Sequence, residues 1–341
     1  MNTRDYYFDN LKFLLITLVV IGHLIEPLNE DPLLRPIYLM IYTFHIPLFV
    51  LISGYFAKNI GSGDYLNKVI SRLIVPYLLF ESLYSLFDFW IYDRAELKFS
   101  YFTPYWLMWF FFSMILWKVA MPYIIRIRYA LPIVIGIAIL AGYANDAQYY
   151  ASVSRTLVFF PFFLIGYFLD KSWIDRLRTT RMRIYSSIGL ILTYVMISSY
   201  GYKYKKEWFF GSFSYESLGH DEWSAGIYRI AVYGAAVLIG GMIMILIPER
   251  QLPWISTMGT NTLYTYLLHG FIVLVLTASD FYTHFTTTTE KLLLIPFGII
   301  LTMLLSFSSI RFLFKWLVEP KMKLLLKHHP SRSNRSKSQT G

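Results

Sequence analysis

The sequence contains no cysteine among its 341 residues. Disulfides, thiolate-metal sites and cysteine nucleophiles are therefore excluded, and the redox compartment is left open. Other metal ligands are poorly spaced, because the neighbouring His328 and His329 have no carboxylate near them at ligand spacing. The sequence therefore predicts no metal site.

Charged residues are also scarce, at 15% of the chain, whereas 56% of the residues are hydrophobic. This composition lies outside the range of soluble globular domains and indicates an integral membrane protein. The first apolar stretch carries polar residues and has no small-residue cleavage site, so we expect it to be a retained helix rather than a signal peptide. Many Trp and Tyr residues fall near the ends of apolar runs, as they do where helices cross a lipid–water interface.

The formal net charge is +10, but the basic residues are scattered in short clusters between apolar segments. A nucleic-acid-binding domain would gather them on one face, so the pattern favours membrane topology and no nucleic-acid partner. Most clusters fall in alternate loops and in the C-terminal tail, which by the positive-inside rule are cytoplasmic. We therefore expect both termini in the cytoplasm.

The fold class predicted is all-α: a polytopic transmembrane helix bundle of about ten helices, taking about 20 apolar residues as one span. The predicted helices cover residues 11–28, 36–56, 69–92, 102–121, 129–145, 155–169, 183–200, 225–247, 257–278 and 292–318. Residues 1–320 form one membrane domain. Residues 321–341 form a basic tail, which we expect to be disordered and cytoplasmic.

Several ionisable residues fall within or near the edges of these predicted spans. Placing such a group at mid-bilayer costs on the order of 3 kcal/mol or more, so each is a functional candidate. They are His23, His45, Arg72, Glu81, Asp88, Arg155, Arg229 and His269. We expect Glu81 and Asp88 to neutralise a cation elsewhere in the bundle.

The first helix carries a polar stripe. Eleven residues separate Lys12 from His23, which returns to within about 20° of the same helix face, and Glu26 lies one turn further on. His23 lies roughly 18 Å along this helix from the cytoplasmic side, and His45 lies roughly 14 Å along the second from the outer side. The two histidines can therefore share one depth.

Other polar groups have two interpretations each. His269 alone can be an interhelical hydrogen-bonding group. Arg72 can be a snorkelling cation at a helix end, or can join Lys58 and Lys68 in a cytoplasmic basic collar suited to an anionic cofactor. Arg229 has the same two interpretations near the outer side.

Five motifs in order resemble the membrane-bound acyltransferase family 3, which includes sugar O-acetylases of bacterial surface polysaccharides. The first, "YFDNLKFLLITLVVIGH", matches the family's basic residue, ten others and histidine, here Lys12 and His23, although many members have arginine at the basic position. The others are "FHIPLFVLISGYF" at 44–56, "SRLIVPYLLF" at 71–80, "FFPFFLIGYFLDK" at 159–171 and "GTNTLYTYLLHGFI" at 259–272. The chain resembles the stand-alone type, without the extracytoplasmic hydrolase-like domain of some members.

The resemblance implies transfer of an acyl group, most often acetyl, from cytoplasmic acyl-CoA to a hydroxyl of an extracytoplasmic glycan or lipid-linked sugar. The enzyme would sit in the bacterial cell membrane, among membrane lipids, as a multi-pass protein. His23 would act as general base or as a covalent acyl relay, two routes that the sequence does not distinguish.

The remaining residues then take supporting roles. Glu26 would orient His23 or bind sugar hydroxyls. The basic residues Lys12, Lys58, Lys68 and Arg72 would hold the coenzyme. His45, Ser53, Arg229 and His269 would orient donor or acceptor.

The aromatic-rich outer loop from Trp208 to Trp223 is either a carbohydrate platform or an interfacial belt. A different class of function stays open: a proton-coupled transporter or flippase of a glycan or lipid intermediate, with buried histidines as proton relays.

Overall fold

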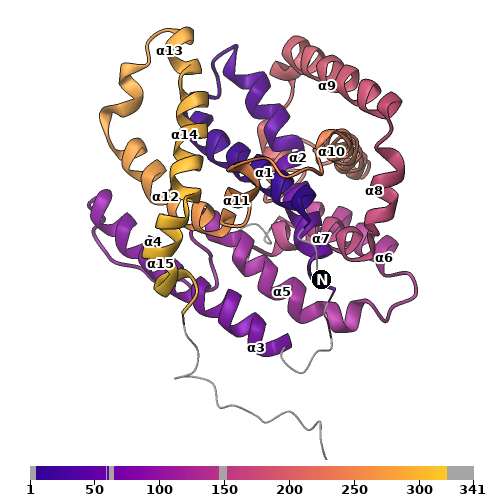
Figure 1. Cartoon of the computed structure of the whole chain (residues 1–341), viewed down its shortest axis with the longest axis horizontal. Helices are drawn as coiled ribbons and strands as arrows, with labels where there is room; N and C mark the ends of the chain where they lie inside the picture. The colour runs from indigo at the N-terminus through magenta and orange to yellow at the C-terminus, as the bar shows by residue number, and fades with distance from the viewer. Residues whose placement is uncertain (1–4, 59, 61–64, 146–151, 321–341) are drawn as a thin grey trace, which may run out of the picture.

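The structure is a computed structural model that describes residues 5–58, 60, 65–145 and 152–320. Within those residues every regular element is a helix, which confirms the all-α class (Figure 1). The predicted tail, residues 321–341, lies outside the described residues. The α-helices are α1 Tyr6–Ile25, α2 Leu34–Tyr55, α3 Tyr65–Val69, α4 Val75–Ile91, α5 Trp109–Ile124, α6 Ala130–Leu140, α7 Val153–Phe168, α8 Lys171–Leu177, α9 Thr180–Tyr200, α10 Gly226–Leu246, α11 Ile255–Met258, α12 Thr262–Ala278, α13 Thr288–Leu292, α14 Leu294–Ser306 and α15 Ser308–Val318.

Short 3-10 and π-helical turns extend or connect these helices. A π-helical turn, Ile70–Ile74, joins α3 to α4, and a 3-10 turn, Glu26–Leu28, continues α1. Further 3-10 turns cover Trp106–Met108, Ala141–Tyr143, Gly201–Lys203, Lys206–Phe209 and Asp280–His284.

Seven helical segments of the described chain are long and apolar enough to cross a membrane, or eight if α7 and α8, bent by 87°, form one span. The protein is therefore a multi-pass membrane protein. Each of the ten predicted segments contains a helix, but segment 292–318 is broken at Phe307, whose backbone is extended with ψ 146°. No proline or glycine marks this break, so the continuous apolar sequence predicted a single helix. The count of ten spans and the orientation of the termini stay predictions.

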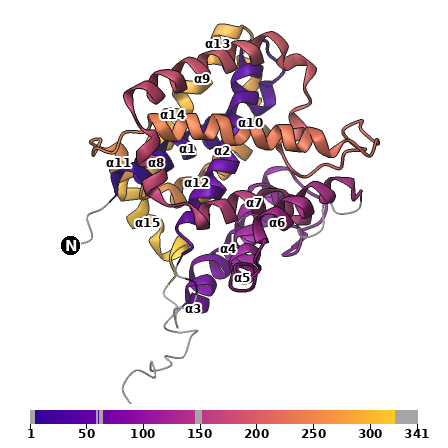
Figure 2. The ribbon, with the colours of Figure 1, turned by 90° about the vertical axis from the view of Figure 1, so that its right-hand side faces the viewer.

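Helices α1 and α2 form the middle of the bundle (Figure 1). Helix α1 packs against α2, α11, α12 and α14, whereas α2 packs most extensively against α7 and also against α9 and α10. Gly54 and Gly166 allow the close approach of α2 and α7, because a Cβ on either would collide with the backbone of the other helix. Figure 2 shows α9 and α10 on the side of the bundle opposite α3 and α5.

The turn between α1 and α2 is tied to α13 through Asp31. This buried carboxylate accepts hydrogen bonds from Lys291 Nζ at 2.9 Å and from Thr288 Oγ1 at 3.1 Å. Burial alone would raise the pKa of Asp31, but Lys291, Thr288 and the Leu33 amide together hold that pKa below its ordinary value. This contact anchors the chain just beyond the end of α1, where the candidate site lies.

Glu81 and Asp88 do not neutralise a cation elsewhere in the bundle, so that expectation was wrong. Both Glu81 oxygens accept from the Tyr105 backbone N–H, at 2.8 and 3.0 Å, and Glu81 forms no ion pair within the described residues. Asp88 pairs with Arg94, which follows it by six residues in the adjoining loop (3.0 Å). These carboxylates fix the segment that leads into Trp106.

Candidate active site

A cavity of about 140 Å³ lies beside the Ile25 end of α1. Its polar lining consists of His23, Glu26, Tyr42, His45 and Arg155. The remaining lining side chains are apolar or aromatic: Ile46, Trp106, Leu107, Trp109, Phe159, Phe209 and Phe210. Because a water molecule occupies about 30 Å³ of liquid, the cavity has room for a small acyl group. The lining comes from α1, α2, α7, the turn before α5 and the loop before α10.

His23 and Glu26 form a pair in the lining of this cavity. Glu26 begins the 3-10 turn that continues α1, so it lies three residues from His23 on the same face, with 3.3 Å between His23 Nδ1 and Glu26 Oε2. The Tyr42 hydroxyl donates to the same carboxylate oxygen at 3.3 Å. With Nδ1–H donated to Glu26, the lone pair of Nε2 is available to accept a proton.

The His23 ring is held between two further rings. Trp106 meets it edge-on, with centroids 4.7 Å apart, and His269 stacks on it at 5.5 Å. Trp106 has φ +31°, in the left-handed region that non-glycine residues rarely adopt, and such strain gathers at functional sites. His269 is fully buried and its Nδ1 bonds Thr265 O at 2.9 Å, so it supports His23 from outside the cavity lining.

His45 lies in the cavity wall, one helix turn beyond Ile41. Its Nδ1 bonds the Ile41 carbonyl oxygen at 2.7 Å, which makes Nδ1 the protonated nitrogen and Nε2 an acceptor. The Tyr42 ring packs edge-on against it at 4.8 Å. The structure thus brings His23 and His45 to one cavity.

Arg155 lies in the first turn of α7 and also lines the cavity. Its guanidinium lies 5.1 Å from the centre of the Trp109 ring, and Nη2 donates to Ser212 Oγ at 3.3 Å. Its Nε is enclosed and has no hydrogen-bond acceptor. Sequence reasoning noted this residue as ionisable within a span but assigned it no role.

Of the aromatic lining, Phe209 and Phe210 fall in a stretch that the sequence singled out, the outer loop from Trp208 to Trp223. Tyr42, Trp106, Trp109, Phe209 and Phe210 occur in a chain with 19% aromatic residues, where each fits an interfacial belt equally well. Outside that loop, a usable signal existed only for Tyr42, which lies three residues before His45 and so shares its helix face.

Two of the four predicted donor-binding cations meet at the Tyr55 end of α2. Lys12 Nζ lies 5.6 Å from the Phe56 ring and pairs with Asp9 at 3.0 Å. Lys58 Nζ lies 4.3 Å from the neighbouring Tyr55 ring. Both lie away from the Ile25 end of α1, on the side where the predicted cytoplasmic face would be.

Lys68 and Arg72 lie one turn apart on exposed positions of α3 and the π-helical turn. Neither lines the His23 cavity. Both interpretations of Arg72 therefore stay open.

Ser53 and Arg229 do not line the His23 cavity either. Ser53 Oγ donates to Phe49 O of its own helix at 2.9 Å. Arg229 is buried in α10 and donates from Nη1 to Trp208 O at 2.8 Å. It thereby holds the outer loop that supplies Phe209 and Phe210.

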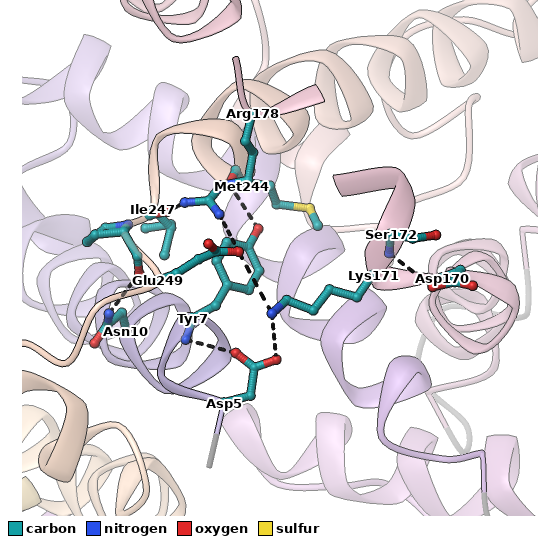
Figure 3. A network of polar contacts seen from close by, with 11 residues as sticks. Asp5, Tyr7, Asn10, Asp170, Lys171, Ser172, Arg178, Met244, Ile247 and Glu249 are labelled. Atoms are coloured by element: carbon teal, nitrogen blue, oxygen red, sulfur yellow. Dashed lines mark hydrogen bonds and ion pairs between the residues drawn. The ribbon is translucent and has the colours of Figure 1, made fainter. Parts of the chain in front are cut away.

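A second polar cluster, the N-terminal network, lies at the Tyr6 end of α1 (Figure 3). We define it as Asp5, Tyr7, Lys171, Arg178 and Glu249. Lys171 Nζ lies 3.0 Å from Asp5, and Arg178 Nη1 lies 2.6 Å from Glu249. The Tyr7 hydroxyl donates to Met244 O at 2.9 Å, and the Arg178 guanidinium lies 5.0 Å from its ring. The network joins α1, α8 and the end of α10.

No metal centre is gathered in the part of the chain that the structure describes: no group of three or more His, Asp or Glu side chains there could hold an ion.

Comparison with known proteins identifies relatives by sequence. The family model described as "Acyltransferase domain" (acyltransferase 3) matches residues 5–311, nearly the whole chain. Nodulation protein NolL of Mesorhizobium japonicum is 44% identical over 75 residues, 21% of this chain and 19% of that protein. Nodulation protein NolL of Sinorhizobium fredii is 44% identical over 77 residues, 21% of this chain and 20% of that protein. The chain thus spans about a fifth of the length of these curated relatives. No solved structure matches it.

Proposed function

Because the chain belongs to acyltransferase family 3 and the resemblance is confirmed, we propose that this enzyme moves an acyl group, most simply acetyl, from cytoplasmic acyl-CoA to a hydroxyl of an extracytoplasmic glycan or lipid-linked sugar. The observation that carries the proposal is the His23–Glu26 pair inside a cavity sized for a small acyl group. The membrane is the cell membrane.

In this proposal His23 acts as the general base. Nε2 takes the proton of the acceptor hydroxyl while the hydroxyl oxygen attacks the thioester carbonyl carbon. The carbon–sulfur bond then breaks, and the coenzyme thiolate leaves with the proton from His23. Glu26 fixes the ring orientation and stabilises the imidazolium that forms between the two steps.

A covalent relay uses the same groups. Nε2 itself attacks the thioester carbonyl carbon, the carbon–sulfur bond breaks, and the thiolate leaves with the Nδ1 proton, passed on by Glu26. The acceptor hydroxyl oxygen then attacks the acyl-imidazole, the carbon–nitrogen bond breaks, and the departing imidazole takes the hydroxyl proton. Rapid mixing of enzyme and donor without acceptor distinguishes the routes, since only the relay releases free coenzyme A in an amount equal to the enzyme.

The donor would enter from the side of Lys12 and Lys58. Eleven residues of helix separate Lys12 from His23, about 16 Å along the axis, so a coenzyme anchored by its phosphates near Lys12 must extend its thioester arm along α1. Ammonium groups act as point charges towards phosphate. Lys68 and Arg72 add positive charge at a neighbouring exposed helix end. If Arg72 belongs to this basic collar, Arg72→Ala should raise KM for acetyl-CoA, and the increase should depend on salt concentration. An unchanged KM would mean that Arg72 is only a snorkelling cation at a helix end.

The acceptor would enter beside Phe209, Phe210 and Trp106, which line the cavity. Aromatic faces pack against the apolar faces of sugar rings, while Glu26 and Tyr42 offer hydrogen bonds to hydroxyls. The loop from Trp208 to Trp223 extends this surface.

The test incubates purified protein in lipid with radiolabelled acetyl-CoA and extracted surface glycans. The parent should label the glycan and His23→Ala should not, whereas His284→Ala, an exposed histidine in the 3-10 turn Asp280–His284, should behave as the parent. Equal labelling by His23→Ala would overturn the assignment of His23. A parent that labels no acceptor with any acyl-CoA, yet drives proton-coupled uptake in vesicles, would instead establish the transporter.

A further inference from the structure

Arg155 is the only lining side chain of the His23 cavity that carries a permanent positive charge. The other charged lining group, Glu26, is already engaged by His23 and Tyr42. Arg155 and Glu26 form no ion pair with each other within the described residues. The cavity therefore presents a guanidinium that no carboxylate of its described wall contacts directly.

The contacts of Arg155 hold its side chain in place but leave part of its hydrogen-bonding capacity unused. Trp109 supports its guanidinium face, and Ser212 supplies a single neutral acceptor at 3.3 Å. Its Nε has no acceptor within the described residues, which is also true of the Nε of Arg178 and of Arg229, so what distinguishes Arg155 from Arg178 is the lack of a carboxylate. Removing a guanidinium from water without a carboxylate costs several kcal/mol, a cost that a bound anionic oxygen would offset.

Arg178 of the N-terminal network is a buried arginine, outside the cavity, that the fold supplies with a carboxylate. Its side chain is 4% exposed, it pairs with Glu249 at 2.6 Å and it also donates to the Ile247 carbonyl oxygen. Arg155 has no comparable partner, although both residues lie near helix ends. Arg229 is likewise buried without a carboxylate among the described residues, but it does not line the His23 cavity, whereas Arg155 does. A partner for Arg155 can therefore arrive with the substrate.

The other polar groups of the lining indicate which substrate atom would be the partner of Arg155. His45 donates Nδ1–H to Ile41 O and so presents an acceptor nitrogen, and the Tyr42 hydroxyl already donates to Glu26. Neither is free to stabilise negative charge. Acyl transfer at His23 places negative charge on one specific atom, the carbonyl oxygen of the acyl group.

We propose that Arg155 is a further catalytic residue, which donates hydrogen bonds to the acyl carbonyl oxygen as it becomes an oxyanion. This inference rests on the proposed function. When the acceptor oxygen bonds to the carbonyl carbon, the carbonyl π electrons move onto its oxygen, and Arg155 stabilises that charge. When the carbon–oxygen double bond reforms, the coenzyme thiolate leaves and takes the proton from His23. His23 and Arg155 line the same cavity, so one bound acyl group can meet both side chains.

The experiment compares Arg155→Met and Arg155→Lys with the parent, using purified protein in lipid with acetyl-CoA and the labelled glycan acceptor. Losing a preorganised oxyanion donor should lower kcat about a hundred- to a thousandfold and leave KM for acetyl-CoA nearly unchanged. Arg155→Lys keeps the charge but not the fork geometry, so it should recover part of kcat. Free guanidinium should restore part of the rate to Arg155→Ala but none to His23→Ala.

Arg178→Met is the matched control, because it removes a buried arginine outside the cavity. It should lower thermal stability and leave kcat per folded molecule intact. Folding of each variant is checked by size exclusion and by its thermal midpoint, so a merely unfolded variant is recognised. Near-parental kcat in folded Arg155→Met would overturn the inference.

A second overturning result is a rise of acceptor KM alone, confined to acidic acceptors, which would make Arg155 a binding group for an acceptor anion. Failure of the proposed function looks different, since the parent itself would then transfer no acyl group. Labelling by the parent, loss in His23→Ala and retention in Arg155→Met would reject only this inference.

Discussion

The two ends of α1 treat charge in opposite ways. At the Tyr6 end, the N-terminal network matches each of its cations with a carboxylate, Lys171 with Asp5 and Arg178 with Glu249. At the Ile25 end, the cavity holds a histidine–glutamate pair and an arginine, Arg155, that forms no ion pair within the described residues. Paired charges stabilise a fold, whereas unsatisfied ones in a cavity are available to a substrate. The first end joins helices, and we propose that the second performs chemistry.

The variant His23→Gln should have the largest effect on activity at the Ile25 end. Glutamine keeps an amide N–H donor but has no nitrogen that accepts a proton. We expect kcat to fall about 10²- to 10⁴-fold, the range for losing a general base. Acyl transfer from acetyl-CoA measures it, with thermal stability followed in parallel. If the rate held while stability dropped, the Ile25 end would be structural like the Tyr6 end.

Glu26→Gln should have the next largest effect. A hydrogen bond to a charged group contributes about 1.5–3 kcal/mol, so removing the carboxylate beside His23 should reduce kcat about ten- to a hundredfold. The ratio of kcat between parent and variant measures it, with KM for acetyl-CoA determined in parallel. Glu30→Gln is the control, since Glu30 is 76% exposed and pairs with Arg35 outside the cavity.

Arg178→Met tests the other end of α1. It removes the Glu249 ion pair and the bond to the Ile247 carbonyl, and we expect it to lower the free energy of unfolding by about 1–3 kcal/mol. Thermal denaturation in lipid or detergent measures the change. Transfer activity per folded molecule should be unaltered. A loss of activity without a loss of stability would show that the Tyr6 end also contributes to catalysis.

Tyr42→Phe should have the smallest effect. It deletes one hydrogen bond to Glu26 while keeping the ring that packs on His45, so about 0.5–1.5 kcal/mol is lost and kcat falls about two- to tenfold. The ratio of kcat between parent and variant measures it. A loss as large as that of His23→Gln would show that the Tyr42 hydroxyl itself contacts the reacting groups.

Much of the first helix could be predicted because its information is local. The spacing of Lys12, His23 and Glu26 along one helix determines their common face, and the structure places His23 and Glu26 in contact. The end of α14 at Phe307 could not be predicted, because neither proline nor glycine marks it. The partners of Glu81 could not be predicted either, since its oxygens bind a backbone amide 24 residues away.

The sequence by itself determined the class of the protein, its family and the polar stripe of α1. Hydrophobic runs, missing cysteines and motif order are all properties of the chain in one dimension. Only the tertiary structure decided which groups surround His23, because Tyr42, Trp106 and Phe210 resemble any other aromatic residues of a membrane protein until the helices pack. It also distinguished Arg155 from Arg178, because the cost of a buried charge depends on which partners the fold brings to it, and sequence spacing does not record those partners.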